Sequence, residues 1–255
     1  MVLHPRLLME GLSFSIPLLV ILLAHELGHF IACRYYGTAC TPPYFIPVPL
    51  GAGTLGAFIK IKSPFRDRRS LFDIGIAGPL TGFVFVLPAL WIGISFSKIY
   101  PKQAVAGGGL YFGEPLIFKL FGRLILDYSP ATQDMVAHPI AMAAWIGLLA
   151  TSLNLLPIWQ LDGGHIAYAV FGRAVQKKIS ITAAIALVLL SFLGWPILSY
   201  LLAGLLLLIL GARSRFYHPA PLFEEDDLGP GRRFLGLIAL LILVLSFIPV
   251  PISLP

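Results

Sequence analysis

Residues 12–32 read LSFSIPLLVILLAHELGHFIA, an apolar run interrupted by His25, Glu26 and His29. A transmembrane helix needs roughly 20 predominantly apolar residues, so this run is long enough to cross a bilayer. Ionisable side chains inside a membrane are costly and rarely occur there without a task. Three of them close together in an apolar segment therefore indicate that this helix carries a polar site.

The motif His25-Glu26-Leu27-Gly28-His29 has the spacing of a helical metal site. Residues four apart in an α-helix lie on one face, about 6 Å apart along the axis, so both imidazoles can reach one metal ion. Glu26 lies roughly 100° around the helix from His25, where it can face a water molecule without binding the metal itself. The same pattern occurs by chance in soluble helices, and its place in an apolar segment is what favours a metal site here.

A third ligand is expected from elsewhere, because catalytic zinc usually takes three protein ligands and leaves one position for water. Residues 154–164, NLLPIWQLDGG, offer Asp162, whose two following glycines allow the backbone to turn closely. A carboxylate in a loop after a helix is the alternative interpretation of Asp162. His165 is a second candidate ligand, with hydrogen bonding behind the ligands or placement at the interface as its alternatives. Asn154 is a candidate donor to a substrate carbonyl or oxyanion, with a bond between helices as the alternative.

The composition indicates that the whole chain belongs in a lipid bilayer. Hydrophobic residues make up 58% of the chain and charged residues 12%, whereas soluble domains carry about 25% charged residues. The mean hydropathy is +0.88. The formal net charge of +6 does not indicate nucleic acid as a partner, since the basic residues stand in short runs between apolar segments. Cys33 and Cys40 are too few for a disulfide framework.

Hydropathy predicts an all-α polytopic membrane protein, one membrane domain over residues 1–255. The long apolar stretch 180–212 is divided at Gly194-Trp195-Pro196, because Gly and Pro interrupt helices. The first span contains ionisable groups and lacks a small-residue cleavage site, so we expect it to persist rather than to be removed as a signal peptide. The six predicted spans are 12–32, 72–96, 138–159, 180–194, 196–212 and 234–252.

The distribution of Lys and Arg supports six spans. Six spans place 13 of the 18 basic residues on one side and 5 on the other, whereas one span over 180–212 would place 9 on each side. Cytoplasmic loops carry an excess of Lys and Arg, so we expect the N-terminus outside and connections 33–71 and 213–233 in the cytoplasm. HELGH and LDGG then both lie near cytoplasmic ends of parallel spans, which predicts an active site towards the cytoplasmic side.

Two connecting segments have patterns of their own. Residues 43–62 are rich in Pro and Gly and then alternate, which predicts a short β-hairpin or small sheet at the cytoplasmic interface. Residues 114–126 predict an amphipathic helix in the outer interface, with a helix packed over the bundle as the alternative. The remaining histidines have no partner pattern and are expected at the interface: His4, His138 and His218.

HELGH followed by NLLPIWQLDGG resembles the site-2 protease family of intramembrane metalloproteases. Two longer stretches are similar to the branch that includes the plastid gravitropism-related proteases and their prokaryotic relatives. They are residues 43–82, PYFIPVPLGAGTLGAFIKIKSPFRDRRSLFDIGIAGPLTG, and residues 138–165, HPIAMAAWIGLLATSLNLLPIWQLDGGH. The resemblance covers about residues 20–172, and the two short motifs together are highly specific.

The resemblance implies a three-helix catalytic core over residues 12–172, with 173–255 as additional C-terminal helices. It implies one Zn²⁺ and a catalytic acid/base at Glu26, with the metal held by His25, His29 and Asp162. Substrates of such a family are transmembrane protein segments, cleaved within or near the membrane. We expect no further helix ahead of the HELGH span and no PDZ or nucleotide-sensing domain, so the family's means of substrate selection are not carried over. The oligomeric state is not predicted.

Two other function classes are weighed against an intramembrane zinc endopeptidase. A metal-binding membrane transporter needs polar groups on several helices near the midplane, and residues 180–212 and 234–252 contain no Asp, Glu or His. An inactive protease-like scaffold that binds membrane partners would be expected to have lost the base or a ligand. Here HELGH and LDGG are both intact.

Overall fold

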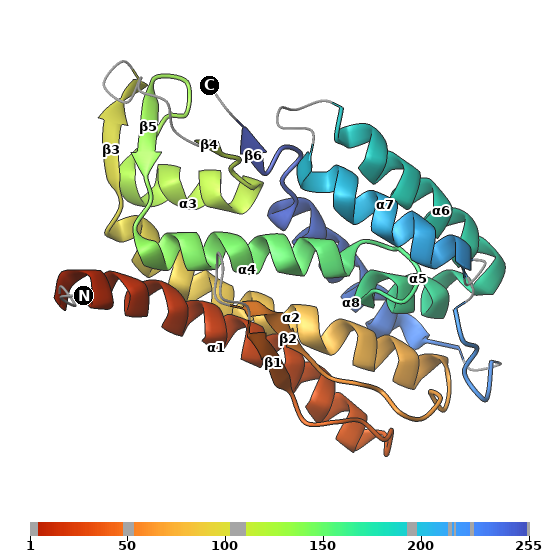
Figure 1. Cartoon of the computed structure of the whole chain (residues 1–255). Coiled ribbons are helices and arrows are strands. Elements are labelled where there is room, and N and C mark those ends of the chain that lie inside the picture. The colour runs from red at the N-terminus through yellow and green to blue at the C-terminus, as the bar shows by residue number, and fades with distance from the viewer. Residues whose placement is uncertain are drawn as a thin grey trace.

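The computed structural model describes residues 5–47, 54–102, 111–192, 198–213, 216, 218–224 and 227–253. These residues form helices and short strands, arranged as Figure 1 shows. The helices are α1 (Pro5–Tyr35), α2 (Arg68–Ser95), α3 (Leu116–Leu126), α4 (Pro139–Leu155), α5 (Asp162–Phe171), α6 (Arg173–Leu190), α7 (Leu198–Arg213) and α8 (Gly229–Ser246). The strands are β1 (Tyr44–Pro47), β2 (Thr54–Phe58), β3 (Lys98–Pro101), β4 (Tyr111–Phe112), β5 (Gln133–Val136) and β6 (Ile252–Ser253).

Among the described residues, three helical stretches are long and apolar enough to cross a membrane: Met9–Tyr35, Arg68–Ser95 and Gly229–Ser246. They match three of the six predicted spans, and the structure does not confirm six. The predicted span 138–159 is a shorter helix, α4, of 17 residues. It ends at Leu155 because Leu156 is extended (ψ 134°), the conformation that a residue before proline prefers. The predicted break at Gly194-Trp195-Pro196 lies outside the described residues, between α6 and α7, which lie side by side.

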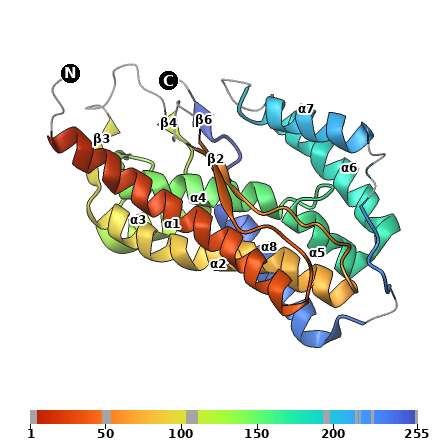
Figure 2. The ribbon, with the colours of Figure 1, turned by 60° about the horizontal axis from the view of Figure 1, so that its bottom comes forward.

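Helices α1, α2 and α4 pack against one another and form the main bundle (Figures 1 and 2). Small residues permit their close approach, as is usual for helices in membranes. A Cβ atom at Gly28 in α1 would overlap the backbone carbonyl of Ala77 in α2, and one at Gly93 would overlap the backbone of Ala141 in α4. The backbones of α1 and α2, and of α2 and α4, therefore approach closely at these glycines.

The outer surface of α1 is apolar, as expected for a helix that faces lipid. The opposite face of the helix carries the buried residues Leu18, Ile21, His25 and His29. The exposed residues recur every three or four positions and so form one stripe: Leu12, Ile16, Leu19, Leu23, Leu27 and Ile31.

The predicted helix over 114–126 is present as α3, and it packs over the bundle, which was the alternative interpretation. Ile117 and Phe118 are buried against the bundle. Another stripe, Leu116, Leu120 and Leu124, remains exposed. The helix thus packs over the bundle and still presents an apolar face outward.

The predicted hairpin in 43–62 is present, although its strands end earlier than the alternation suggested. β1 and β2 are antiparallel, with Tyr44 opposite Phe58. The alternating residues that follow pair with the chain just after α1: Thr41 N–H donates to Lys60 O over 3.0 Å, and Lys62 N–H donates to Ala39 O over 2.7 Å. One edge of the 59–62 segment is therefore occupied, and the other faces the cavity described below.

Helix α8 is held at both ends. At its start, Arg232 binds the Asp73 carboxylate of α2 through two hydrogen bonds of 2.9 and 2.8 Å, and Tyr36 donates to the same carboxylate. Beyond its end, β6 pairs with β4. The connection that precedes α8 lies beside the segment before α2, because Phe223 N–H donates to Arg66 O over 2.9 Å.

Candidate metal centre

His25 and His29 lie one turn apart on the buried face of α1, and their Nε2 atoms are 3.2 Å apart. Both side chains are almost fully buried. Glycines of α2 make room for them, since a Cβ atom at Gly78 would overlap the His29 imidazole and one at Gly82 would stand 3.1 Å from His25 Cβ. The apolar helix and the glycine-containing helix beside it together position the two imidazoles.

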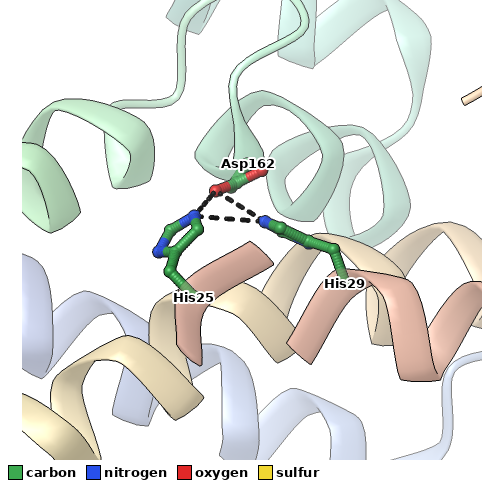
Figure 3. Close-up of side chains that lie close together, drawn as sticks. All are labelled: His25, His29 and Asp162. Carbon is green, nitrogen blue, oxygen red and sulfur yellow. Dashed lines mark hydrogen bonds and ion pairs between the residues drawn. The ribbon is translucent and has the colours of Figure 1, made fainter. Parts of the chain in front are cut away.

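Asp162 is the first residue of α5, where a carboxylate is favoured by the positive end of the helix dipole. After α4 ends, the chain turns back through Trp159, which has a positive φ of 47°. Gly163 and Gly164 are required by the close approach that follows. A Cβ atom at Gly163 would overlap the carbonyl of Leu155, and one at Gly164 would overlap that of Trp159. The LDGG sequence thus folds α5 against the end of α4 and points Asp162 at α1 (Figure 3).

The three side chains have the separations expected around one tetrahedral zinc ion. Asp162 Oδ2 lies 3.2 Å from His25 Nε2 and 3.3 Å from His29 Nε2. Atoms held roughly 2.0–2.1 Å from a tetrahedral ion stand about 3.3 Å from one another. Among the described residues, these three form the only group of three or more His, Cys, Asp or Glu residues that could hold a metal ion.

The tautomer of His29 supports the same interpretation. Its Nδ1 lies 2.7 Å from the carbonyl oxygen of Ile74, and because a carbonyl only accepts, Nδ1 carries the proton. Nε2 of the neutral ring then presents a lone pair towards Asp162 Oδ2. Fixing the tautomer of a metal ligand through its other ring nitrogen is the usual arrangement in metal sites. A cation is the species that stabilises such converging lone pairs.

Glu26 lies beside this centre in a cavity of about 720 Å³. Its carboxylate is buried, and Oε2 accepts a hydrogen bond of 2.9 Å from the backbone N–H of Ile59. The cavity is lined by residues of the HELGH motif, of the LDGG motif and of the segment after β2. Its polar lining includes Lys60, Asn154, Asp162 and His165. Glu26 is therefore near the three converging atoms without being one of them, as the motif spacing predicts.

Asn154, near the end of α4, also lies at the centre. Its Nδ2 is 3.3 Å from His25 Nε2, and it lines the same cavity. The predicted proximity of Asn154 to the metal site is therefore present in the structure.

His165 is not part of the group of ligand atoms. Its Nδ1 is 2.7 Å from Nε2 of His218, in the connection between α7 and α8. Burial and the neighbouring His218 lower the pKa of His165 to about 3, and burial lowers the pKa of His218. The expectation that His218 lies at the interface without a partner is wrong, since its side chain is 1% exposed. No local pattern could reveal this pair, because its members are 53 residues apart.

Of the other two unassigned histidines, only His138 lies in the described part of the chain, and it is not part of this centre. His138 precedes α4 and accepts a hydrogen bond from Ile140 N–H over 3.3 Å, which caps that helix. His4 lies outside the described residues.

Comparison with known proteins assigns the chain that carries these residues to a family. The family model for Peptidase family M50 matches residues 13–194, which include HELGH and LDGG. The chain belongs to peptidase family M50. This confirms the resemblance to site-2 protease metalloproteases, and the helices long enough to cross a bilayer agree with a membrane protein of that family.

Several curated relatives of this M50 chain carry similar names. The "Probable zinc metalloprotease EGY1, chloroplastic" of Arabidopsis thaliana is 33% identical over 244 residues, covering 94% of this chain and 43% of the relative. The protein of the same name from Oryza sativa subsp. japonica is 32% identical, covering 94% and 41%. "Probable zinc metalloprotease EGY2, chloroplastic" of Arabidopsis thaliana is 30% identical, covering 97% and 43%. The chain thus spans less than half the length of these relatives. No solved structure matches it significantly.

Proposed function

We propose that this M50 chain is an intramembrane zinc metalloendopeptidase that cleaves transmembrane segments of membrane proteins. Its zinc would be held by His25, His29 and Asp162, and Glu26 would be the general base. The observation that carries the proposal is the convergence of His25 Nε2, His29 Nε2 and Asp162 Oδ2 at tetrahedral spacing beside the buried Glu26. The names of the curated relatives support zinc as the metal.

Bound zinc supplies a water molecule whose pKa is lowered towards about 7 and a positive charge that polarises a carbonyl oxygen. The chain's own residues do the rest. Glu26 accepts the proton of the attacking water and passes it to the leaving nitrogen of the peptide bond. Asn154 would donate a hydrogen bond to the oxygen of the attacked carbonyl, and its position in the cavity lining supports this role.

A substrate helix hides its carbonyls in internal hydrogen bonds and must unwind before it can be cut. The segment after β2 offers an extended template for the unwound chain. The carbonyl of Lys60 and the N–H of Lys62 are hydrogen-bonded to the backbone of residues 39–41. The N–H of Ile59 points the opposite way and donates to Glu26. Backbone groups alternate along an extended strand, so the cavity-facing edge of 59–62 can pair with an added strand.

Two observations support the placement of the chain in the membrane: the exposed apolar stripe of α1 and the unequal distribution of Lys and Arg between the two sides of the predicted spans. We propose that residues 12–172 form the catalytic core and that the active site faces the cytoplasm, with the N-terminus outside. The hydrogen bond between Phe223 and Arg66 supports placing connections 213–233 and 33–71 on the same side.

The alternative classes receive less support. A transporter would need several polar sites along a path through the membrane. In the described part of the chain there is a single group of three or more His, Cys, Asp or Glu residues that could hold a metal ion. An inactive scaffold has no need of a base, and Glu26 is retained within the site.

A cleavage assay on the purified chain in detergent, with a reporter containing one transmembrane segment, tests the proposal. We expect zinc-dependent cleavage that a chelator abolishes and added zinc restores. Glu26→Gln should keep the zinc and lose cleavage, because an amide cannot accept the proton. Metal-dependent turnover that survives Glu26→Gln would refute the role of Glu26, and the absence of cleavage in the zinc-loaded wild type would refute the protease assignment.

A further inference from the structure

The family model ends at residue 194, yet Pro219, which lies beyond that point, lines the same cavity as the proposed site. His218 lies in the connection between α7 and α8 and contacts His165, which lines the cavity together with Pro219. The His218 ring packs against Tyr168 of α5, with ring centroids 4.7 Å apart. The C-terminal helices are therefore joined to the site through this pair of histidines, of which His218 is buried.

The hydrogen bonds of the pair assign the protons on both rings. His218 Nδ1 lies 2.8 Å from the carbonyl oxygen of Pro219, which only accepts, so His218 Nδ1 carries a proton. Nε2 of neutral His218 is then an acceptor, and Nδ1 of His165 must donate to it. Neutral His165 consequently has an unprotonated Nε2. The lowered pKa values of both rings agree with neutral forms.

The unprotonated Nε2 of His165 has no hydrogen-bond partner among the described residues, although the ring lines the cavity. An acceptor that is open to the cavity and has no protein partner can take a hydrogen bond from a ligand that supplies a donor. The 59–62 segment and His165 line the same cavity. An extended substrate chain in that cavity carries donors of the required kind in its backbone N–H groups.

We propose that His165 contacts the substrate by accepting a backbone N–H at Nε2, and that His218 is a positioning residue that holds His165 in the required tautomer. The inference rests on the proposed function, since it takes an unwound peptide as the ligand. It gives the connection between α7 and α8 a task in substrate binding, outside the region that the family model matches.

The first experiment measures the tautomer and needs no proteolysis. In the full chain with ¹⁵N-labelled histidine, two-bond ¹H–¹⁵N correlations distinguish a protonated ring nitrogen from an unprotonated one. We expect an unprotonated Nε2 in His165 of the wild type and of Tyr168→Phe, which keeps the ring beside His218 and removes only the hydroxyl that donates to Glu224. His218→Leu should abolish this single tautomer, and a protonated Nε2 in the wild type would overturn the inference.

The second experiment measures cleavage of the transmembrane reporter and the zinc content. His165→Ala and His218→Leu should each lower kcat/KM about tenfold, the effect of one lost hydrogen bond, with zinc retained. The double variant should lose no more than either single variant. His218→Gln keeps an acceptor for His165 and should restore most activity, whereas equal activity of His218→Leu and the wild type would overturn the positioning role.

Replacing single amides near the cleaved bond of the reporter by esters identifies the donated N–H. One such ester should weaken cleavage by the wild type and have no effect on His165→Ala. If every ester affects both proteins equally, His165 does not accept a substrate N–H. If zinc-dependent cleavage is absent altogether, the proposed function fails while the tautomer measurement still decides the role of His218.

Discussion

The imidazole of His29 lies directly against Gly78, so that a Cβ atom added to Gly78 would overlap Nε2 and both adjacent ring carbons. The ring cannot simply turn away, because its Nδ1 is held by the carbonyl oxygen of Ile74 over 2.7 Å. The glycine of one helix thus determines where a proposed ligand on the next helix stands. The proposed metal centre depends on close helix packing as well as on its three side chains.

Gly78→Ala should therefore displace His29 and lower zinc occupancy, although no ligand is changed. Gly82→Ala should have a smaller effect, since its Cβ would stand 3.1 Å from His25 Cβ. Gly231→Ala, where nothing lies within 4 Å, is the matched control and should leave the zinc content unchanged. Metal analysis of the purified variants measures all three. Full zinc occupancy in Gly78→Ala would mean that the helices separate easily at this point.

Asp162→Ala should reduce both zinc occupancy and cleavage, because it removes one of three converging ligand atoms. His165→Ala should spare occupancy, since its Nδ1 binds His218 instead. Metal content by mass spectrometry together with the reporter assay separates the two roles. A site emptied by His165→Ala but filled in Asp162→Ala would reverse the ligand assignment and leave the protease proposal standing.

The Asp73–Arg232 pair should contribute measurably to stability, because two charge-assisted hydrogen bonds join α2 to α8 and both side chains are partly buried. Asp73→Asn and Arg232→Gln should each lower the thermal midpoint. Their coupling in a double-mutant cycle should be about 1.5 kcal/mol. Asp227→Asn and Arg233→Gln are the matched control, since that pair is mostly exposed and should couple weakly. Equal coupling in the two cycles would contradict this account.

Residues 213–233 should lie on the same, cytoplasmic, side as residues 33–71. Single cysteines at Ser63 and Asp227, in a background lacking Cys33 and Cys40, can be treated with an impermeant maleimide on intact cells. Both should react only after the membrane is opened. Labelling at 227 alone in intact cells would mean that 180–212 crosses the membrane once, and six spans would be excluded.

The sequence was sufficient to predict the two motifs of the proposed metal centre, because the features of each motif are local. Helical spacing places His25 and His29 on one face, and the motif around Asp162 carries its own turn glycines. The early end of α4 and the separate helix α5 were not predicted, since hydropathy averages over the extended residue Leu156.

The contacts that tie the C-terminal helices to the core could not be predicted. His218 meets His165 across 53 residues and Arg232 meets Asp73 across 159 residues, and in both cases each partner has an ordinary sequence context. A histidine or arginine near the end of an apolar segment usually faces the interface. The packing of whole helices, which local patterns do not encode, decides these pairs.

The separation of 137 residues between His25 and Asp162 also has a consequence for biosynthesis. A ribosome adds about 5–20 residues per second, so HELGH enters the membrane on the order of ten seconds before Asp162 is made. A three-ligand centre cannot be completed during that interval. The growing chain therefore carries His25, Glu26 and His29 without Asp162 during that interval, so its two imidazoles are then free to bind another metal or another partner.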